Sequence, residues 1–153
     1  NLGYQVSHSG KGKWDKQGDY IGKKVLEQIR SDLKAGKKPY KLQLVGLKMG
    51  GKPIEDFAHD FWPISSNGVA APCGFVTSPW YHPEKKTNIA MGYVPFDGTL
   101  NKHGLPIGNY GKKFMVHLPD KYSETVGEPV DAEIVKMPFT PSVNKNIREI
   151  FNK

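Results

Sequence analysis

The feature that most constrains this chain is a single change of hydrophobic period. Residues 19–34 carry apolar side chains at helical spacing, and after Pro39 the pattern becomes alternating and rich in β-forming residues. No second helical pattern separates the β-rich segments, which favours an antiparallel barrel over a parallel sheet with crossover helices. The sequence predicts a mainly β fold, namely a small Greek-key β-barrel of about six strands preceded by one amphipathic helix. The recognisable strands are residues 41–49, 74–77, 88–94, 114–118 and 130–137.

The helix is expected between Asp19 and Lys34. Asp19 can cap its start, and Gly36 is suited to ending it. Its apolar face comprises Ile21, Val25, Leu26, Ile29 and Leu33. The Gly/Lys-rich stretch before it, residues 7–18, lacks the Gly-Lys-Ser/Thr ending of a phosphate loop and is interpreted as a plain loop.

Two stretches of the β region carry expectations about packing. Residues 50–72 contain Pro and Gly and are interpreted as one long irregular connection. Residues 89–94 are apolar or small on both faces, as in a central strand packed on two sides. Tyr93 is therefore interpreted as a core residue, and Gly92 as fixed between two packed faces.

The excess positive charge lies in the first third of the chain. The net charge is +7, residues 1–48 hold 11 Lys/Arg and 4 Asp/Glu, and residues 49–153 hold 11 of each. A basic segment can serve nucleic acid, an anionic ligand tail or an acidic partner surface, and it is also what a solvated helix face with flanking loops looks like. We favour the solvated face.

The number of cysteines and the length of the apolar runs indicate in which cellular compartment the protein is expected. The single cysteine, Cys73, cannot form an intramolecular disulfide, so we expect a cytoplasmic bacterial protein, or a mitochondrial matrix protein if the source is eukaryotic. No apolar run approaches the ~20 residues of a membrane span, so no membrane partner is expected. The chain begins at Asn1 with neither an initiator Met nor an apolar leader, which suggests that an upstream region is missing.

The polar residues give little sign of chemistry. The histidines are dispersed and show no His-x-x-x-His or Cys-His spacing, so no metal site is predicted; they are His8, His59, His82, His103 and His117. No Gly-x-Ser-x-Gly elbow is present, and Cys73 is interpreted as an inert, partly buried thiol. No catalytic residue is predicted within the chain.

The one site-like feature is an aromatic cluster between two prolines. Trp80, Tyr81 and His82 lie between Pro79 and Pro83 and are expected to form a rigid exposed turn. Such a turn can stack on a planar ligand or form an interface. A second aromatic cluster is attributed to ordinary packing of the long connection; it comprises Phe57, His59, Phe61 and Trp62.

Three stretches, in order, resemble the C-terminal portion of the glycine-cleavage T-proteins, a family of aminomethyltransferases. The first is Asp-Tyr-Ile-Gly-Lys-Lys-Val-Leu at residues 19–26. The second is Gly-Phe-Val-Thr-Ser-Pro at 74–79, followed by Lys-Thr-Asn-Ile-Ala-Met-Gly-Tyr-Val-Pro at 86–95. The third is Ile-Val-Lys-Met-Pro-Phe at 134–139. Pro79 stands where the family usually has Gly, and residues 122–127 look like an insertion.

The resemblance implies a division of the chain. Residues 1–40 are expected to be a linker segment and helix leading from a missing N-terminal folate-binding region. Residues 41–141 are expected to be the aminomethyltransferase-like C-terminal β-barrel. Residues 142–153 are expected to be a short tail, unlike the T-protein, with the helical pattern Val143, Ile147, Ile150 and Phe151.

The resemblance also implies a function. The full-length protein is expected to transfer a one-carbon unit from an amine or related donor to tetrahydrofolate, with this chain as a scaffold domain that is inactive alone. The family's catalytic carboxylate and main folate contacts lie upstream, and a Tyr found near the end of some members aligns closest to Asn144. Trp80, Tyr81 and His82 are expected at the cofactor cleft rim or the interdomain surface. The implied partners are the N-terminal folate-binding domain and a lipoyl carrier protein.

Two alternatives stay open. One is the folate-side barrel of a sarcosine or dimethylglycine dehydrogenase, which only the upstream sequence would distinguish. The other is a stand-alone nucleic-acid-binding β-barrel, suggested by aromatics within the basic third: Tyr4, Trp14, Tyr20 and Tyr40. Nucleic acid is not favoured, because such a barrel needs aromatics along one exposed sheet face and Tyr93 is interpreted as core.

Overall fold

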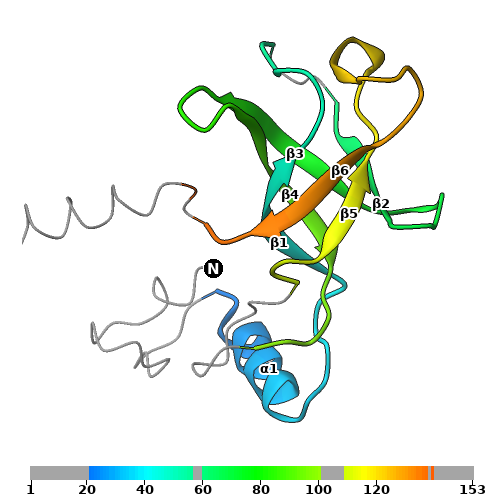
Figure 1. Cartoon of the computed structure of the whole chain (residues 1–153). Coiled ribbons are helices and arrows are strands. Elements are labelled where there is room, and N and C mark those ends of the chain that lie inside the picture. Colours follow the sequence, from blue (N-terminus) through cyan, green and yellow to red (C-terminus); the bar gives the residue numbers. More distant parts are fainter. Residues whose placement is uncertain (1–20, 57–59, 101–108, 138, 140–153) are drawn as a thin grey trace, which may run out of the picture. The chain divides into compact units, whose positions relative to one another are not determined.

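A computed structural model describes residues 21–56, 60–100, 109–137 and 139 (Figure 1). These residues fall into two compact units, one formed by 21–41 with 96–100 and the other by 42–95 with 109–139, apart from the gaps named above. Several expectations lie outside the described residues. They concern the loop 7–18, the cap Asp19, the tail 142–153 with Asn144, and Tyr4, His8, Trp14, Tyr20, Phe57, His59 and His103.

The first unit contains helix α1, Lys23–Lys34. The helix begins later than expected, because Gly22 at its N-cap has a φ of 88°, which is incompatible with a helical turn through Ile21 and Gly22. Its end agrees with the expectation, since Gly36 has a φ of 71° and turns the chain away. In the same unit, Tyr40 packs edge to face on Phe96 with ring centroids 5.2 Å apart.

The second unit is a closed barrel whose six strands, within the described part of the chain, run in the order β1-β4-β3-β2-β5-β6 with antiparallel pairing throughout. Strands β2, β3 and β4 form a meander, and β1 lies beside β4, which is the Greek-key arrangement. The predicted fold class is confirmed. The strands are β1 Leu42–Met49, β2 Trp62–Ser66, β3 Pro72–His82, β4 Thr87–Pro95, β5 Lys113–Val116 and β6 Val130–Val135.

Strand β2 corrects one expectation, because it lies inside the stretch 50–72 that was interpreted as irregular. A proline normally argues against a strand between two neighbours. Here Pro63 is accommodated next to a register shift between Ile64 and Ser65. The Pro63 carbonyl accepts a hydrogen bond from the His117 backbone N–H at 3.0 Å, so the ladder toward the β5 side continues.

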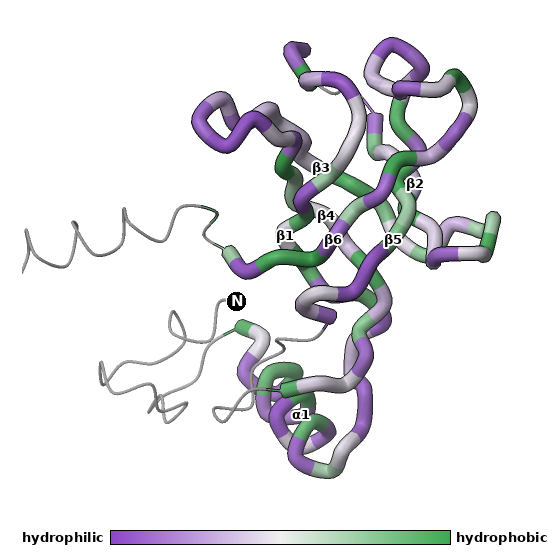
Figure 2. The backbone as a smooth tube through the Cα atoms, in the orientation of Figure 1, coloured by the Kyte–Doolittle hydropathy of each residue, from purple (hydrophilic) through white to green (hydrophobic). Residues whose placement is uncertain are grey.

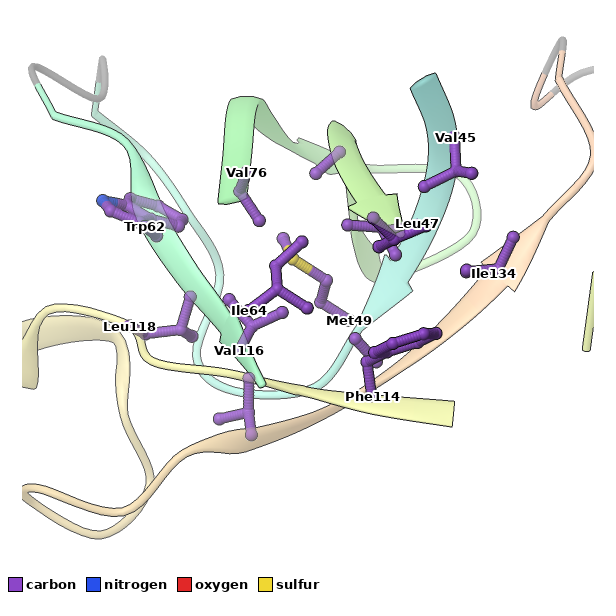
Figure 3. Packing of buried hydrophobic residues seen from close by; sticks show 14 of the residues in the cluster. Val45, Leu47, Met49, Trp62, Ile64, Val76, Phe114, Val116, Leu118 and Ile134 are labelled. Carbon is purple, nitrogen blue, oxygen red and sulfur yellow. The ribbon is translucent and has the colours of Figure 1, made fainter. Parts of the chain in front are cut away.

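The barrel core is formed by the inward side chains of all six strands together with neighbouring residues such as Leu118, and Figure 3 labels part of this cluster. Leu47, Ile64 and Val116 are fully buried. Figure 2 shows hydrophobic stretches along β3 and β4 and a hydrophilic tip on the hairpin that joins them. Buried and half-buried residues alternate along β4, as expected of a strand with one packed face.

Tyr93 lies outside this core, contrary to the expectation. Along β4 the buried positions are Asn88, Ala90, Gly92 and Val94, and the residues between them are half-buried. The strand is a barrel wall, so only one of its faces packs against the interior. Apolar residues on both faces of β4 therefore do not show that both faces pack in the core.

Asn88 is the buried polar residue that ties the β1–β2 connection to the barrel. Its Nδ2 donates to the carbonyl oxygens of Gly50 and Lys52, each at 2.9 Å. Its Oδ1 accepts a hydrogen bond from the Ile54 backbone N–H at 3.1 Å. The side chain is 2% exposed, so water cannot replace these partners.

Replacing this amide should therefore destabilise the fold strongly. We expect Asn88→Ala to lower the free energy of unfolding by about 2–4 kcal/mol, because it strands buried backbone groups without partners. The neighbouring Thr87→Ala, on the outer face, should change it by less than about 0.5 kcal/mol. Urea unfolding of both variants measures the difference, and equal effects would contradict the anchoring role.

Gly92 is fixed by the close approach of β3. A Cβ built there would lie 2.8 Å from the Phe75 carbonyl oxygen and 3.2 Å from Leu47 Cδ1. The first contact is with backbone that is held in the ladder, so it cannot move aside easily.

Gly92→Val should consequently overpack the wall and cost roughly 1–3 kcal/mol of stability. Gly50→Ala is the matched control, because a Cβ at Gly50 meets its nearest atoms only at 3.6 and 3.7 Å. Thermal unfolding should show a clear decrease in Tm for the first variant and little change for the second. An unchanged Tm for Gly92→Val would show that the wall can relax.

Candidate functional site

The predicted aromatic site lies at the end of β3 and not in a turn. Trp80, Tyr81 and His82 pair with Ile89, Asn88 and Thr87 of β4. The expectation of a turn was wrong because the cross-strand ladder continues past Pro79. The turn follows at residues 83–86, where the Lys86 N–H donates to the Pro83 carbonyl at 3.3 Å.

Strand geometry also separates the three side chains. Successive residues of a strand point to opposite faces, so Trp80 and His82 share the outer face and Tyr81 lies on the other face, opposite buried Asn88. Trp80 is 48% exposed, whereas Tyr81 and His82 are half-buried. The structure therefore does not bring the three together as one ligand cluster, but it leaves the Trp80 ring accessible.

His82 has a local structural contact. Its Nδ1 lies 3.4 Å from the Lys85 backbone N–H, which donates to it across the β3–β4 turn. A ring nitrogen occupied in this way supports the turn and is not oriented by a carboxylate as a general base would be.

Sequence reasoning missed an aromatic row on the outer wall. Leu44, Tyr93 and Phe75 stand in register across β1, β4 and β3. The Phe75 and Tyr93 rings lie 5.4 Å apart, and Phe61, just before β2, stacks on Phe75 at 5.2 Å. The signal that could have revealed it is the alternation of side chains along β4: because Val94 points into the core, its neighbour Tyr93 points outward.

The second predicted aromatic cluster divides between core and surface. Trp62 is buried and packs near Tyr122 with ring centroids 5.9 Å apart, as ordinary packing requires. Phe61 is 66% exposed and belongs to the outer row.

Within the described part of the chain, Ser65 and His117 come nearest to a nucleophile–base pair. Ser65 Oγ and His117 Nε2 lie 3.1 Å apart. Ser66 Oγ and Cys73 Sγ lie 3.6 Å apart beside them, and Cys73 packs partly against the core. Among the described contacts no carboxylate orients His117, so the pair lacks the third member that activates a serine or a thiol.

Among the described residues, clear pKa shifts fall on two groups that do not suit proton transfer at neutral pH. Burial raises the pKa of the Tyr40 phenol. The hydrogen bond that Lys121 Nζ donates to Asp56 at 2.8 Å raises the pKa of the ammonium. Both shifts favour the protonated form, so neither group is a base at neutral pH.

A recess of about 300 Å³ lies where β1, β4, β5 and β6 meet, and its lining carries charges of both signs. Lys48 and Lys113 both stand in register with Glu133, and Asp131 lines the same recess. Alternating charges of this kind neutralise one another and favour neither an anion nor a cation.

Residues 21–56, 60–100, 109–137 and 139 contain no group of three or more His, Cys, Asp or Glu side chains placed to hold a metal ion. Over the same residues, no helix is long and apolar enough to cross a bilayer.

Comparison with known proteins gives a consistent family. Residues 43–140 match the glycine cleavage T-protein C-terminal barrel domain. An aminomethyltransferase of Synechocystis sp. is 33% identical over 107 residues, which is 70% of this chain and 26% of that protein. The crystal structure of glycine cleavage system aminomethyltransferase T from Bartonella henselae aligns with a TM-score of 0.49 at 23% identity, over 78% of this chain and 26% of that chain. This chain spans about a quarter of the length of these relatives.

The two tryptophans of the barrel should respond differently to truncation. Trp62→Ala should cost about 3–5 kcal/mol of stability, because it empties a core position. Trp80→Ala should cost less than about 1 kcal/mol, because the ring stands on the outer face. Urea unfolding measures both, and acrylamide should quench Trp80 fluorescence more than Trp62 fluorescence. A comparable loss from both variants would remove Trp80 as a group available to a ligand.

Proposed function

This chain belongs to the glycine cleavage T-protein family through its C-terminal barrel domain, and from that premise we propose that it is the scaffold domain of a folate-dependent aminomethyl- or methyltransferase. In this proposal the full-length protein transfers a one-carbon unit from an amine or related donor to tetrahydrofolate. The observation that carries the proposal is the match over residues 43–140, which covers β1 from Gln43 onward and the other five strands completely.

The barrel's own chemistry supports a scaffold in preference to a catalytic unit. Ser65 and His117 lack an orienting carboxylate among the described contacts, and Tyr40 and Lys121 are held protonated. Catalysis of one-carbon transfer requires groups pre-positioned around both the donor and the folate. We assign those groups to the preceding region of the full-length protein.

Within this proposal the barrel forms one wall of the folate cleft. The exposed ring of Trp80 lies at the cleft rim or the interdomain surface, with His82 on the same face and Tyr81 beside Asn88. In the same proposal the basic first third, residues 1–48, faces an acidic neighbour or the anionic tail of the folate. A lipoyl carrier protein is a proposed partner, and the proposed location is the bacterial cytoplasm or the mitochondrial matrix.

The folate-side barrel of a sarcosine or dimethylglycine dehydrogenase differs from this proposal only in what precedes the barrel. A flavin-binding domain upstream would identify that alternative. The described barrel residues have no feature that favours it.

The isolated chain should be inactive. We expect residues 1–153 to give no measurable heat with tetrahydrofolate in calorimetric titration and no transfer of a methyl or aminomethyl group, because most of a folate pocket lies outside the barrel. The intact Synechocystis aminomethyltransferase, assayed in parallel, is the positive control. Micromolar binding or measurable turnover by residues 1–153 would refute the scaffold assignment.

A further inference from the structure

The two sides of the barrel wall differ in composition. Strands β1, β3 and β4 contain no Asp or Glu, and their outward positions are mainly apolar. Strands β5 and β6 instead direct Lys113, Asp131 and Glu133 outward. One side thus has the composition of a solvated surface, and the other does not.

The outward apolar residues of β1, β4 and β3, together with Phe61, form what we call the outer apolar face. Its principal members are Leu44, Phe61, Phe75, Trp80, Met91 and Tyr93. Leu44 is 38% exposed, Phe61 66% and Trp80 48%. Clustered exposed side chains of this size mark interaction surfaces in soluble proteins, whereas scattered ones do not.

The face is ordered before any partner binds. Phe61 stacks on Phe75 with ring centroids 5.2 Å apart, and the Phe75 and Tyr93 rings pack at 5.4 Å with a 40° tilt. Tyr93 stands directly between Phe75 and Leu44 in the strand register. Aromatic rings held by one another lose little rotamer freedom on binding, so their burial contributes efficiently to affinity.

Part of the same wall is already covered by apolar groups of this chain. A Cβ at Gly46 would lie 2.7 Å from Met137 Cγ and 3.1 Å from Phe139 Cε1, so both side chains lie over β1 at that glycine. Lys85 Nζ donates a hydrogen bond to the Phe139 carbonyl oxygen. This side of the barrel therefore accommodates apolar packing on its outer surface.

We propose that the outer apolar face is the docking surface for the domain that precedes the barrel in the full-length protein. The inference rests on the proposed function, which requires such a domain. The curated Synechocystis relative is about four times as long as the part this chain matches, so most of the folded protein lies outside residues 1–153. The surface that docks here is apolar, to match the mainly apolar outward residues of the three strands.

The composition of the face favours a protein surface over nucleic acid. Barrels that bind single strands alternate aromatic rings with Lys and Arg, which follow the phosphates. Here the positions beside Tyr93 and Phe75 are Leu44, Met91 and Ser78. The rings also pack against one another and so have less free surface for bases.

The experiment uses a chimera in which residues 1–153 replace the matching region of the Synechocystis aminomethyltransferase. Hydroxyl-radical labelling with mass spectrometry compares the chimera with the isolated chain. We expect labelling of Phe61, Trp80 and Tyr93 to fall by roughly fivefold in the chimera, as for side chains at the dry centre of an interface. Met115 and exposed Tyr110, off the outer apolar face, are matched controls and should be labelled equally in both.

Substitution gives a second test. Leu44→Asp should lower the Tm of the chimera but hardly change that of the isolated chain, because the residue becomes buried only on docking. Met115→Asp is the control and should have the same effect in both. If the chimera does not assemble, Asp at the Synechocystis position that matches Leu44 gives the same test in an intact enzyme.

Other outcomes overturn the proposal. Equal labelling of the face in chimera and isolated chain would refute docking. If the face of the isolated chain becomes protected as its concentration rises, the face binds a second copy of the chain. If the face of the isolated chain is protected at all concentrations, another part of the same chain covers it. Protection of the isolated chain by oligothymidylate would assign it to nucleic acid.

The same chimera separates this proposal from the proposed function. It is assayed for one-carbon transfer to tetrahydrofolate. Transfer without protection of the face refutes only the docking surface, and protection without transfer refutes only the catalytic assignment.

Discussion

The barrel depends on one buried amide. The connection from β1 to β2 must carry the chain to a strand that is not its neighbour, and the Asn88 side chain holds the start of that connection against β4 through Gly50, Lys52 and Ile54. The Gly50 N–H also donates to Asp131 and the Lys52 N–H to the Tyr122 carbonyl. A polar group buried this fully is stable only because each of its bonds is made, so the connection and the barrel wall constrain each other.

The sequence was sufficient for the class of fold because the class follows from periodicity. The change after Pro39 separates α1 from the barrel, and five strands follow from alternation or β-rich composition. Strand β2 could not be predicted, since Pro63 and two serines disguise it and its pairing with β3 and β5 is long-range. The predicted start of α1 was wrong for a local reason, because Gly22 adopts a left-handed backbone conformation.

The candidate site was harder to predict than the fold. Three adjacent residues such as Trp80, Tyr81 and His82 look like a cluster in sequence, but a strand directs alternate side chains to opposite faces. Whether they share a face depends on whether the ladder continues past Pro79, which is a property of β4 and not of β3. The outer row of Leu44, Tyr93 and Phe75 was equally hidden, because its members come from three strands and meet only through the register.

In the proposed scaffold role, the division between an apolar and a charged half of the wall gives the barrel a surface on which a second domain can dock. A closed barrel satisfies its backbone hydrogen bonds internally, so its outer face is free to be specialised for docking at little cost to the core. The size of the inward side chains, such as Leu47 and Val76, determines where β4 and β3 lie. That position sets the outer row, since inner and outer residues alternate along the same strands. Stability of the core and geometry of the proposed docking surface are thus properties of the same backbone, and a change at an inner position such as Gly92 must act on both.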